Sequence, residues 1–202
     1  MPRKPLIYVP DVSVHVIHRG INRGPIFFDD TDREVFLTFL RAASEHHLLS
    51  VHGFSLMDTH YHLMATPSNE RCLPRAMKEL GGRYVYYFNR RYERIGTLWS
   101  GRYRGLLIDD ERYWFTCLRY IDFNPVKAGI VRDPEAYPWS SYRCHARGER
   151  FTWLAEHHLY RALGPCPATR QEAYRAMCAE RVTEAERTLA ALTGKKQKKQ
   201  DD

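Results

Sequence analysis

The apolar residues of this chain repeat with a period of two in some stretches and with a helical period in others. The stretch DVSVHVIHRG alternates valine with other residues, as a half-buried strand does. The stretch DREVFLTFLRAASEHH instead places Val35, Phe36 and Phe39 at helical spacing. The same criteria, applied along the chain, predict strands over residues 11–20, 48–58, 59–67 and 103–108 and helices over residues 32–47, 73–92 and 110–124.

The order of these elements is strand, helix, strand, strand, helix, strand, helix, and it predicts an α+β fold. The first six match the ferredoxin-like βαββαβ arrangement, an antiparallel sheet with its helices on one face. The helix over 110–124 is an addition, which we expect to be stopped by Pro125 because proline cannot continue a helix. We also expect Gly81 and Gly82 to break or soften the helix over 73–92.

The composition changes after Gly129. The next stretch, VRDPEAYPWSSYRCHARGER, is rich in proline and serine and is predicted to be irregular. Helical stretches follow near Thr152–Leu163 and Thr169–Leu192, and we interpret His157 and His158 as a pair on a helix surface. We therefore divide the chain into a main domain over 1–131, a helical C-terminal extension over 132–193 and a disordered basic tail over 194–202.

The bulk composition is that of a globular protein and excludes several classes. Of the 202 residues, 44% are hydrophobic, yet no run of about eighteen apolar residues could form a membrane span. The start, MPRKPLIYVPDVSV, lacks the apolar segment of a signal peptide, so we expect a cytoplasmic protein without a membrane partner. The five cysteines are scattered and include no CxxC pair, which argues against a disulfide framework and a zinc knuckle.

The positive charge of the chain is concentrated in one segment. The net charge is +7, and residues 75–104 hold eight basic residues against two acidic ones, interleaved with tyrosine, phenylalanine and tryptophan. Basic side chains neutralise phosphates and aromatic rings stack on unpaired bases, so this composition suits single-stranded nucleic acid. A solvated helix face with core aromatics is an equal alternative for this segment taken alone.

Two histidines stand one residue apart in MDTHYHLMAT. On a strand, residues i and i+2 share a face, so His60 and His62 lie side by side while Tyr61 points the other way. Two neutral imidazoles that converge on one point provide half of a metal site. Two hydrogen-bonded, half-buried histidines are the simpler alternative.

The stretch RYIDFNP supplies candidates for the other half of the site. Tyr120 and Asn124 are four residues apart, which places them on one helix face. In this element order, the added helix can lie beside the sheet where His60 and His62 emerge. We therefore predict that His60, His62 and the amide oxygen of Asn124 hold a divalent cation, with Tyr120 next to it.

Four segments, taken together and in order, resemble a known family. They are HVIHRGINRGPIFFDD, MDTHYHLMATP, YFNRRYERIGTLWSGRYR and YIDFNPVKAGIV, and they cover roughly residues 14–131. The chain resembles the single-tyrosine HUH transposases, most closely the branch of REP-associated tyrosine transposases (RAYT). The name HUH denotes two histidines with an apolar residue between them, and this chain has Tyr61 at that middle position. The Tyr61 side chain faces away from the proposed metal.

The resemblance implies a function, a cofactor and a partner. Tyr120 matches the nucleophile, His60 and His62 match the metal pair, and Asn124 falls at the third ligand position. The implied enzyme is a DNA nickase and ligase that cleaves single-stranded DNA through a 5′-phosphotyrosine intermediate, at repetitive palindromic hairpins. It implies Mg²⁺ or Mn²⁺, although two imidazoles alone equally admit zinc, nickel or copper. Family members occur as monomers and as homodimers.

The resemblance, for the first turn, and the basic aromatic segment over 75–104 point to residues that contact DNA. A solvated turn is an equal alternative for Arg19, Asn22 and Arg23. Structural packing and pairing are an equal alternative for Trp99, Arg102 and Arg104. The candidates are Arg19, Asn22, Arg23, Arg83, Arg90, Arg91, Trp99, Arg102 and Arg104.

Two other functions stay open on the sequence alone. A domesticated transposase that acts as a repressor or architectural factor would bind DNA without catalysis and would need no metal. A metal-dependent phosphohydrolase would use water as its nucleophile, and such sites usually contain carboxylate ligands. The chain offers only Asp58 or Asp122 for that purpose near the predicted site.

Overall fold

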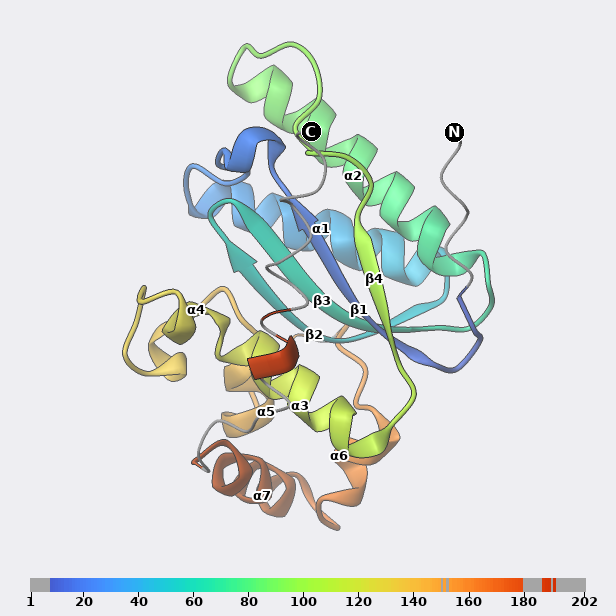
Figure 1. Cartoon of the computed structure of the whole chain (residues 1–202), viewed down its shortest axis with the longest axis vertical. Helices are drawn as coiled ribbons and strands as arrows, with labels where there is room; N and C mark the ends of the chain where they lie inside the picture. Colours follow the sequence, from blue (N-terminus) through green and yellow to red (C-terminus); the bar gives the residue numbers. More distant parts are fainter. Residues whose placement is uncertain (1–7, 150, 152, 180–186, 190, 192–202) are drawn as a thin grey trace.

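Four antiparallel strands form one sheet at the centre of the molecule (Figure 1). The computed structural model describes residues 8–149, 151, 153–179, 187–189 and 191. The strands, in the sheet order β2-β3-β1-β4, are β1 (Ser13–Arg19), β2 (Leu49–Met57), β3 (His60–Pro67) and β4 (Arg104–Ile108). The predicted α+β, ferredoxin-like class is confirmed, and each strand is slightly shorter than predicted.

Two long helices, α1 (Asp30–His46) and α2 (Cys72–Arg91), cover one face of the sheet. Phe36 of α1 and Leu80 of α2 are fully buried in the main core together with Leu63 of β3. Burial of the apolar stripe of each helix against the sheet is the main source of stability for such an arrangement.

The glycine pair of α2 does not interrupt the helix, so the predicted break was wrong. Gly81 lies against Trp99, whose indole N–H donates to the Gly81 carbonyl oxygen at 3.3 Å. A Cβ atom at Gly81 would lie 3.4 Å from the same indole nitrogen. This is an ordinary van der Waals distance, so Trp99 packs directly on the helix at Gly81 without requiring a glycine there.

The opposite face of the sheet is covered by α3 (Glu111–Asp122), which continues into the short helix α4 (Asn124–Lys127). Gly53 of β2 lets α3 approach closely, because a Cβ atom there would meet Leu118 Cδ1 at 2.8 Å. Pro125 lies in the first turn of α4, where its missing N–H costs nothing. The added helix thus packs on the face predicted for it, but it ends at Asp122, and Pro125 lies inside the next helix instead of stopping the first, which corrects the prediction.

The segment after Gly129 is more ordered than predicted. It contains a 3₁₀ turn, η2 (Pro134–Ala136), and a helix, α5 (Tyr142–Arg147), so the prediction of an irregular stretch was wrong there. The stretch predicted as helical near Thr152–Leu163 is helical only in α6 (His158–Ala162).

The last predicted helix is observed in its first part, as α7 (Pro167–Ala179). Parts of the predicted helix beyond Ala179, and all of the predicted disordered tail over 194–202, lie outside the described residues. The division into three regions stays a prediction.

His157 contacts His158, with ring centroids 4.2 Å apart, but it is buried and does not lie on a helix surface, which corrects the prediction for it. Its ring stacks on Trp114 with centroids 4.5 Å apart, and its Nδ1 accepts a hydrogen bond from the backbone N–H of Leu159. His157 therefore caps α6 from a buried position, because an N-cap side chain satisfies a backbone donor of the first turn. His158 is exposed.

A buried carboxylate, Asp122, joins the end of α3 to the C-terminal helices. Its oxygens accept hydrogen bonds from Ser141 Oγ at 2.6 Å, His145 Nδ1 at 2.9 Å and Tyr174 Oη at 2.7 Å. Ser141 and His145 belong to the start and body of α5, and Tyr174 belongs to α7. The C-terminal helices thereby fix the last turn of α3, where Tyr120 also lies.

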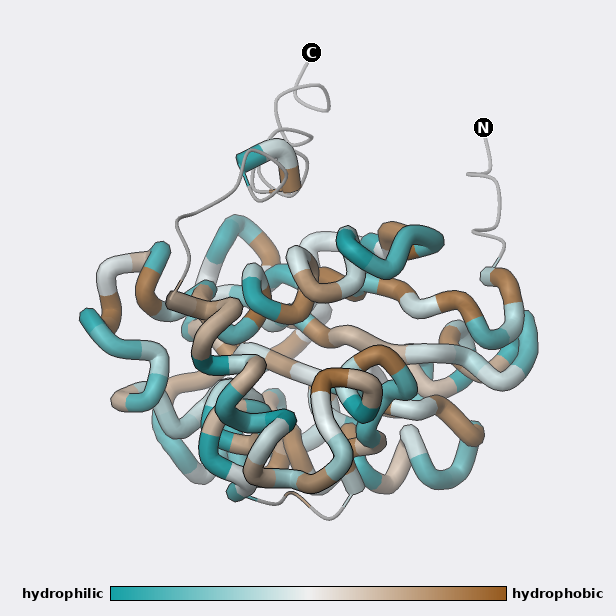
Figure 2. The backbone as a smooth tube through the Cα atoms, turned by 90° about the horizontal axis from the view of Figure 1, so that it is seen from below, coloured by the Kyte–Doolittle hydropathy of each residue, from teal (hydrophilic) through white to brown (hydrophobic). Residues whose placement is uncertain are grey.

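Hydrophobic and hydrophilic stretches alternate along the described chain (Figure 2). Among the described residues, no helix combines the length and hydropathy that a membrane crossing requires.

Acidification is expected to destabilise the fold through His52 of β2. The Nδ1–H of the ring donates to the Ala155 carbonyl oxygen and its Nε2 accepts from Thr66 Oγ1, each at 2.8 Å, and burial lowers its pKa to about 4. Since the unfolded chain binds a proton near pH 6.5 and the folded chain does not, stability falls as pH drops from 6.5 towards 4. For this one histidine we expect a loss of about 2 kcal/mol between pH 7 and pH 5.

Urea unfolding of wild type and His52→Gln at pH 7 and pH 5 measures this contribution. The variant is expected to lose less free energy of unfolding between the two pH values than wild type does. Equal losses in wild type and His52→Gln would contradict the assignment.

Candidate active site

The two histidines of β3 share one face of the sheet, as predicted. The ring centroids of His60 and His62 lie 5.0 Å apart. Tyr61 points to the opposite face, where it is fully buried and packs edge-on against Trp99. The strand alternation thus directs both imidazoles towards α3 and keeps the tyrosine between them in the main core.

Tyr120 and Asn124 meet the histidines from α3 and α4. The Tyr120 ring lies edge-on to His62, with centroids 5.7 Å apart, and the Asn124 amide nitrogen is 3.2 Å from His62 Nε2. Both side chains are buried. The structure therefore brings together the four residues that the sequence singled out, on one face of the sheet and within a single chain.

A fifth member, His15 of β1, was not predicted. Its Nε2 lies 2.8 Å from His62 Nδ1, and its ring centroid is 5.9 Å from that of Tyr120. The alternation of β1 was a usable signal, because it places His15 on the face opposite the valines. The strand pairing could not be predicted from the sequence. In the sheet, Ile17 lies directly opposite His62, and His15 is the diagonal neighbour of His62 on the same face.

Burial keeps the three imidazoles neutral. It lowers the pKa of His15 to about 3 and that of His60 to about 4, and the pKa of His62 lies well below its usual range for the same reason. Nearby arginines lower these values further, Arg104 for His15 and Arg19 for His60. Neutral imidazole is the form that binds a metal ion.

The donor set fits a divalent cation. Thr59 Oγ1 is 3.2 Å from His60 Nδ1, which leaves the Nε2 of that ring for a ligand. If His62 Nδ1–H donates to His15, the lone pair of His62 Nε2 is directed towards Asn124. Amide orientation is assigned from the hydrogen-bond network, and a half-turn of the Asn124 amide presents its oxygen at the same place.

Positive side chains surround this group. Arg19 lies opposite His60 on β1, and Arg104 lies opposite Ile17 at the start of β4, so both belong to the same face. Partial burial lowers the pKa of Arg19, and the neighbouring Arg104 and Arg23 lower it further. The Lys127 ammonium is 4.3 Å from the centroid of the Tyr120 ring. A cluster of mutually repelling cations is a favourable place for a phosphate.

The turn after β1 carries the other predicted contacts near the site. In the 3₁₀ turn η1 (Ile21–Arg23), Asn22 and Arg23 adopt left-handed backbone angles with φ of 52° and 56°. Gly20 permits this turn, since a Cβ atom there would lie 2.3 Å from the Gly24 carbonyl oxygen. Asn22 and Arg23 are exposed, as is Arg102 before β4.

Four of the predicted DNA contacts lie elsewhere. Trp99 is only 9% exposed and stacks on His18 with centroids 4.1 Å apart, so its ring is a core residue and cannot stack on a base. Arg91 pairs with Asp29 and Asp32, each at 2.6 Å. Arg83 and Arg90 are exposed on α2, in the helix layer opposite Tyr120. The structure does not bring these four together with the site.

The family model "Transposase IS200 like" matches residues 8–124, more than half of the chain. A solved structure of a REP-associated tyrosine transposase bound to a REP hairpin superimposes with a TM-score of 0.63 at 16% sequence identity, covering 78% of this chain and 93% of that one.

A second solved structure, a putative transposase from Deinococcus radiodurans R1, has a TM-score of 0.42 at 19% identity and covers 55% of this chain and 89% of that one. No curated protein sequence matches the chain.

Proposed function

The chain belongs to the IS200-like transposase family, and from this premise we propose that it cleaves and rejoins single-stranded DNA through a covalent link between Tyr120 and a 5′-phosphate. The observation that carries the proposal is the meeting of Tyr120 with His60, His62 and Asn124 on one face of the sheet. The tyrosine provides a nucleophile, and the two neutral imidazoles and the amide next to it provide ligands for a metal ion.

His60, His62 and Asn124 are assigned to hold the cation, Mg²⁺ or Mn²⁺ by analogy with the family. When bound, such an ion supplies Lewis-acid polarisation of the scissile phosphate. His15 is assigned a supporting role: its hydrogen bond to His62 Nδ1 fixes the tautomer and orientation of that ligand, as partners of metal-binding histidines commonly do.

Tyr120 is assigned the attack on phosphorus. Its phenolic oxygen forms a bond to phosphorus while the bond from phosphorus to the 3′ oxygen breaks, and the leaving 3′ oxygen takes up a proton. Attack by another 3′-OH reverses the step and releases Tyr120. Arg19, Arg104 and Lys127 lie close enough to this group to neutralise charge on the phosphate.

The proposed substrate is single-stranded DNA that carries a hairpin. The similar transposase structure is bound to a REP hairpin, and the exposed Asn22, Arg23 and Arg102 extend the positive surface beyond the site. We therefore propose that Arg19, Arg104 and these three exposed residues are the main DNA contacts. All four proposed site residues come from one chain, so a monomer is sufficient for the chemistry.

Removal of the metal is expected to stop cleavage while DNA binding persists. The test uses labelled single-stranded hairpin DNA with wild type, His60→Ala and His62→Ala, in EDTA and with added Mn²⁺. We expect no cleavage in EDTA, recovery with Mn²⁺, and a loss of roughly 100-fold or more in both variants. His158→Ala, which changes an exposed histidine far along the chain, is the matched control. Binding without cleavage in wild type at any metal concentration would instead indicate a DNA-binding protein without catalysis.

A further inference from the structure

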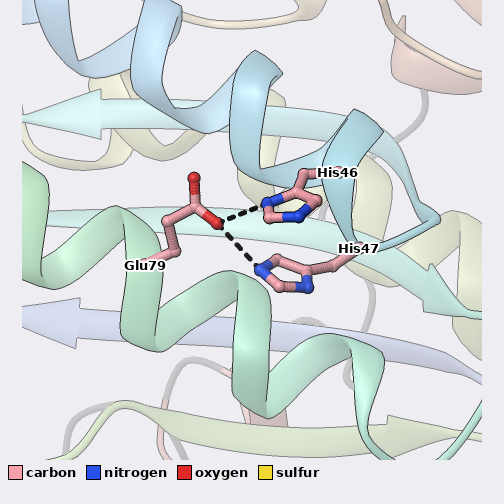
Figure 3. A group of neighbouring side chains, drawn as sticks. All are labelled: His46, His47 and Glu79. Atoms are coloured by element: carbon pink, nitrogen blue, oxygen red, sulfur yellow. Dashed lines mark hydrogen bonds and ion pairs between the residues drawn. The ribbon is translucent and has the colours of Figure 1, made fainter.

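A second group of metal-binding side chains lies on the other helix layer. His46 is the last residue of α1, His47 follows it as the C-cap, and Glu79 lies near the middle of α2. Figure 3 shows both rings directed at the same carboxylate oxygen, and His46 Nδ1 and His47 Nε2 are each 2.9 Å from Glu79 Oε2. Their donor atoms all lie within 4.8 Å of one another.

We propose that His46, His47 and Glu79 form a binding site for a divalent transition-metal ion of the Zn²⁺ class, which links the end of α1 to α2. The site is distinct from the one around Tyr120, because α1 and α2 cover the opposite face of the sheet. It does not depend on the proposed function.

The donor set favours this class of ion. Two imidazole nitrogens and one carboxylate oxygen form the three-ligand set of many open zinc sites, whose bonds measure about 2.0–2.2 Å. Ligands around one such ion lie about 3 Å apart, close to the observed contacts, so small side-chain shifts suffice. Mg²⁺ prefers oxygen ligands and is disfavoured here.

The surroundings favour a cation on the Oε2 side of the carboxylate. Hydrogen bonds from His46, His47 and Arg83 hold the pKa of Glu79 below its usual value, which keeps it ionised. Arg83 Nη1 binds the other oxygen, Oε1, at 3.3 Å and so orients the carboxylate while leaving Oε2 to the histidines. The C-terminal end of α1 adds the partial negative charge of its carbonyl groups.

Exposure leaves room for the remaining ligands. The His46 side chain is 70% exposed, while those of His47 and Glu79 are 17% and 24% exposed. Water can therefore complete the coordination sphere from the solvent side, and two of the three protein ligands are already held by the helix packing.

The test is a Zn²⁺ titration of full-length, metal-stripped protein by calorimetry, compared with Glu79→Gln and with the double variant His46→Ala, His47→Ala. We expect each to bind one equivalent of Zn²⁺ fewer than wild type, while His158→Ala, an exposed histidine outside the group, binds the wild-type number. Because the group lies at the edge of the helix layer, with His46 exposed and His47 and Glu79 partly exposed, circular dichroism is expected to show the wild-type fold.

The same comparison separates this site from the proposed catalytic one. If the ligand set around Tyr120 also binds zinc, His62→Ala should lose the equivalent bound there and keep the one bound at Glu79. If that set does not bind zinc, His62→Ala should bind the wild-type number. In both cases wild type and Glu79→Gln still differ by one equivalent. The same number of equivalents in wild type, Glu79→Gln and the double variant would overturn the proposal.

Discussion

Tyr120→Phe is expected to abolish the covalent protein–DNA adduct and to reduce cleavage at least about 10³-fold, because no other group supplies the attacking oxygen. The substitution keeps the ring in its place against His15 and His62 and removes only the hydroxyl. Affinity for the uncleaved hairpin DNA should stay within about twofold, since the cations around the site are unchanged. A denaturing gel with labelled DNA measures the adduct and the cleaved product.

Tyr113→Phe is the matched control for this experiment. Tyr113 lies in the first turn of the same helix, is only partly buried, and packs against the buried cluster that contains Trp114 and Leu118. It should form the adduct at the wild-type rate. Cleavage by Tyr120→Phe at the wild-type rate would show that the nucleophile is water or another tyrosine and would contradict the assignment of Tyr120.

Asp122→Ala is expected to lower the free energy of unfolding by about 3–5 kcal/mol, because it leaves three buried donors without their acceptor. Asp122 is fully buried, and its partners Ser141, His145 and Tyr174 come from the C-terminal helices. Asp122→Asn keeps the volume and one acceptor oxygen, and we expect a smaller loss. Urea unfolding at pH 7 measures both.

Glu111→Ala removes an exposed carboxylate from the same helix and serves as the control. Its cost should stay below about 1 kcal/mol. A comparable cost for Asp122→Ala would mean that the carboxylate does not anchor α3. Asp122 lies two residues from Tyr120, so loss of this anchor is also expected to reduce DNA cleavage in the protein that remains folded.

The sheet and the shared face of the two proposed ligand histidines could be predicted because their signals are local, whereas only the resemblance of its segment to the family singled out Tyr120 among thirteen tyrosines. Strand alternation gives the shared face of His60 and His62, and helical spacing gives that of Tyr120 and Asn124. His15 was missed because its place beside His62 depends on the pairing of β1 with β3, two strands far apart in the chain. The chain pattern cannot specify that register without the folded sheet.

The order of α5 and the placement of the aromatic rings of the basic segment could not be predicted from the sequence, for related reasons. The order of α5 depends on contacts of Ser141 and His145 with Asp122, across 19 and 23 residues. Composition also cannot distinguish a ring in the core from one at the surface. The sequence therefore left DNA contact and structural packing as equal alternatives for Trp99, and the ring packs on His18.

The central claim is tested most directly by mapping the residue that carries the DNA. Wild-type protein is incubated with hairpin single-stranded DNA and Mn²⁺, denatured and digested with protease and nuclease, and the modified peptide is identified by mass spectrometry. We expect a nucleotide 5′-phosphate on Tyr120 in the peptide YIDFNPVK. A nucleotide on any other residue, or efficient cleavage without a modified peptide, would contradict the proposed mechanism.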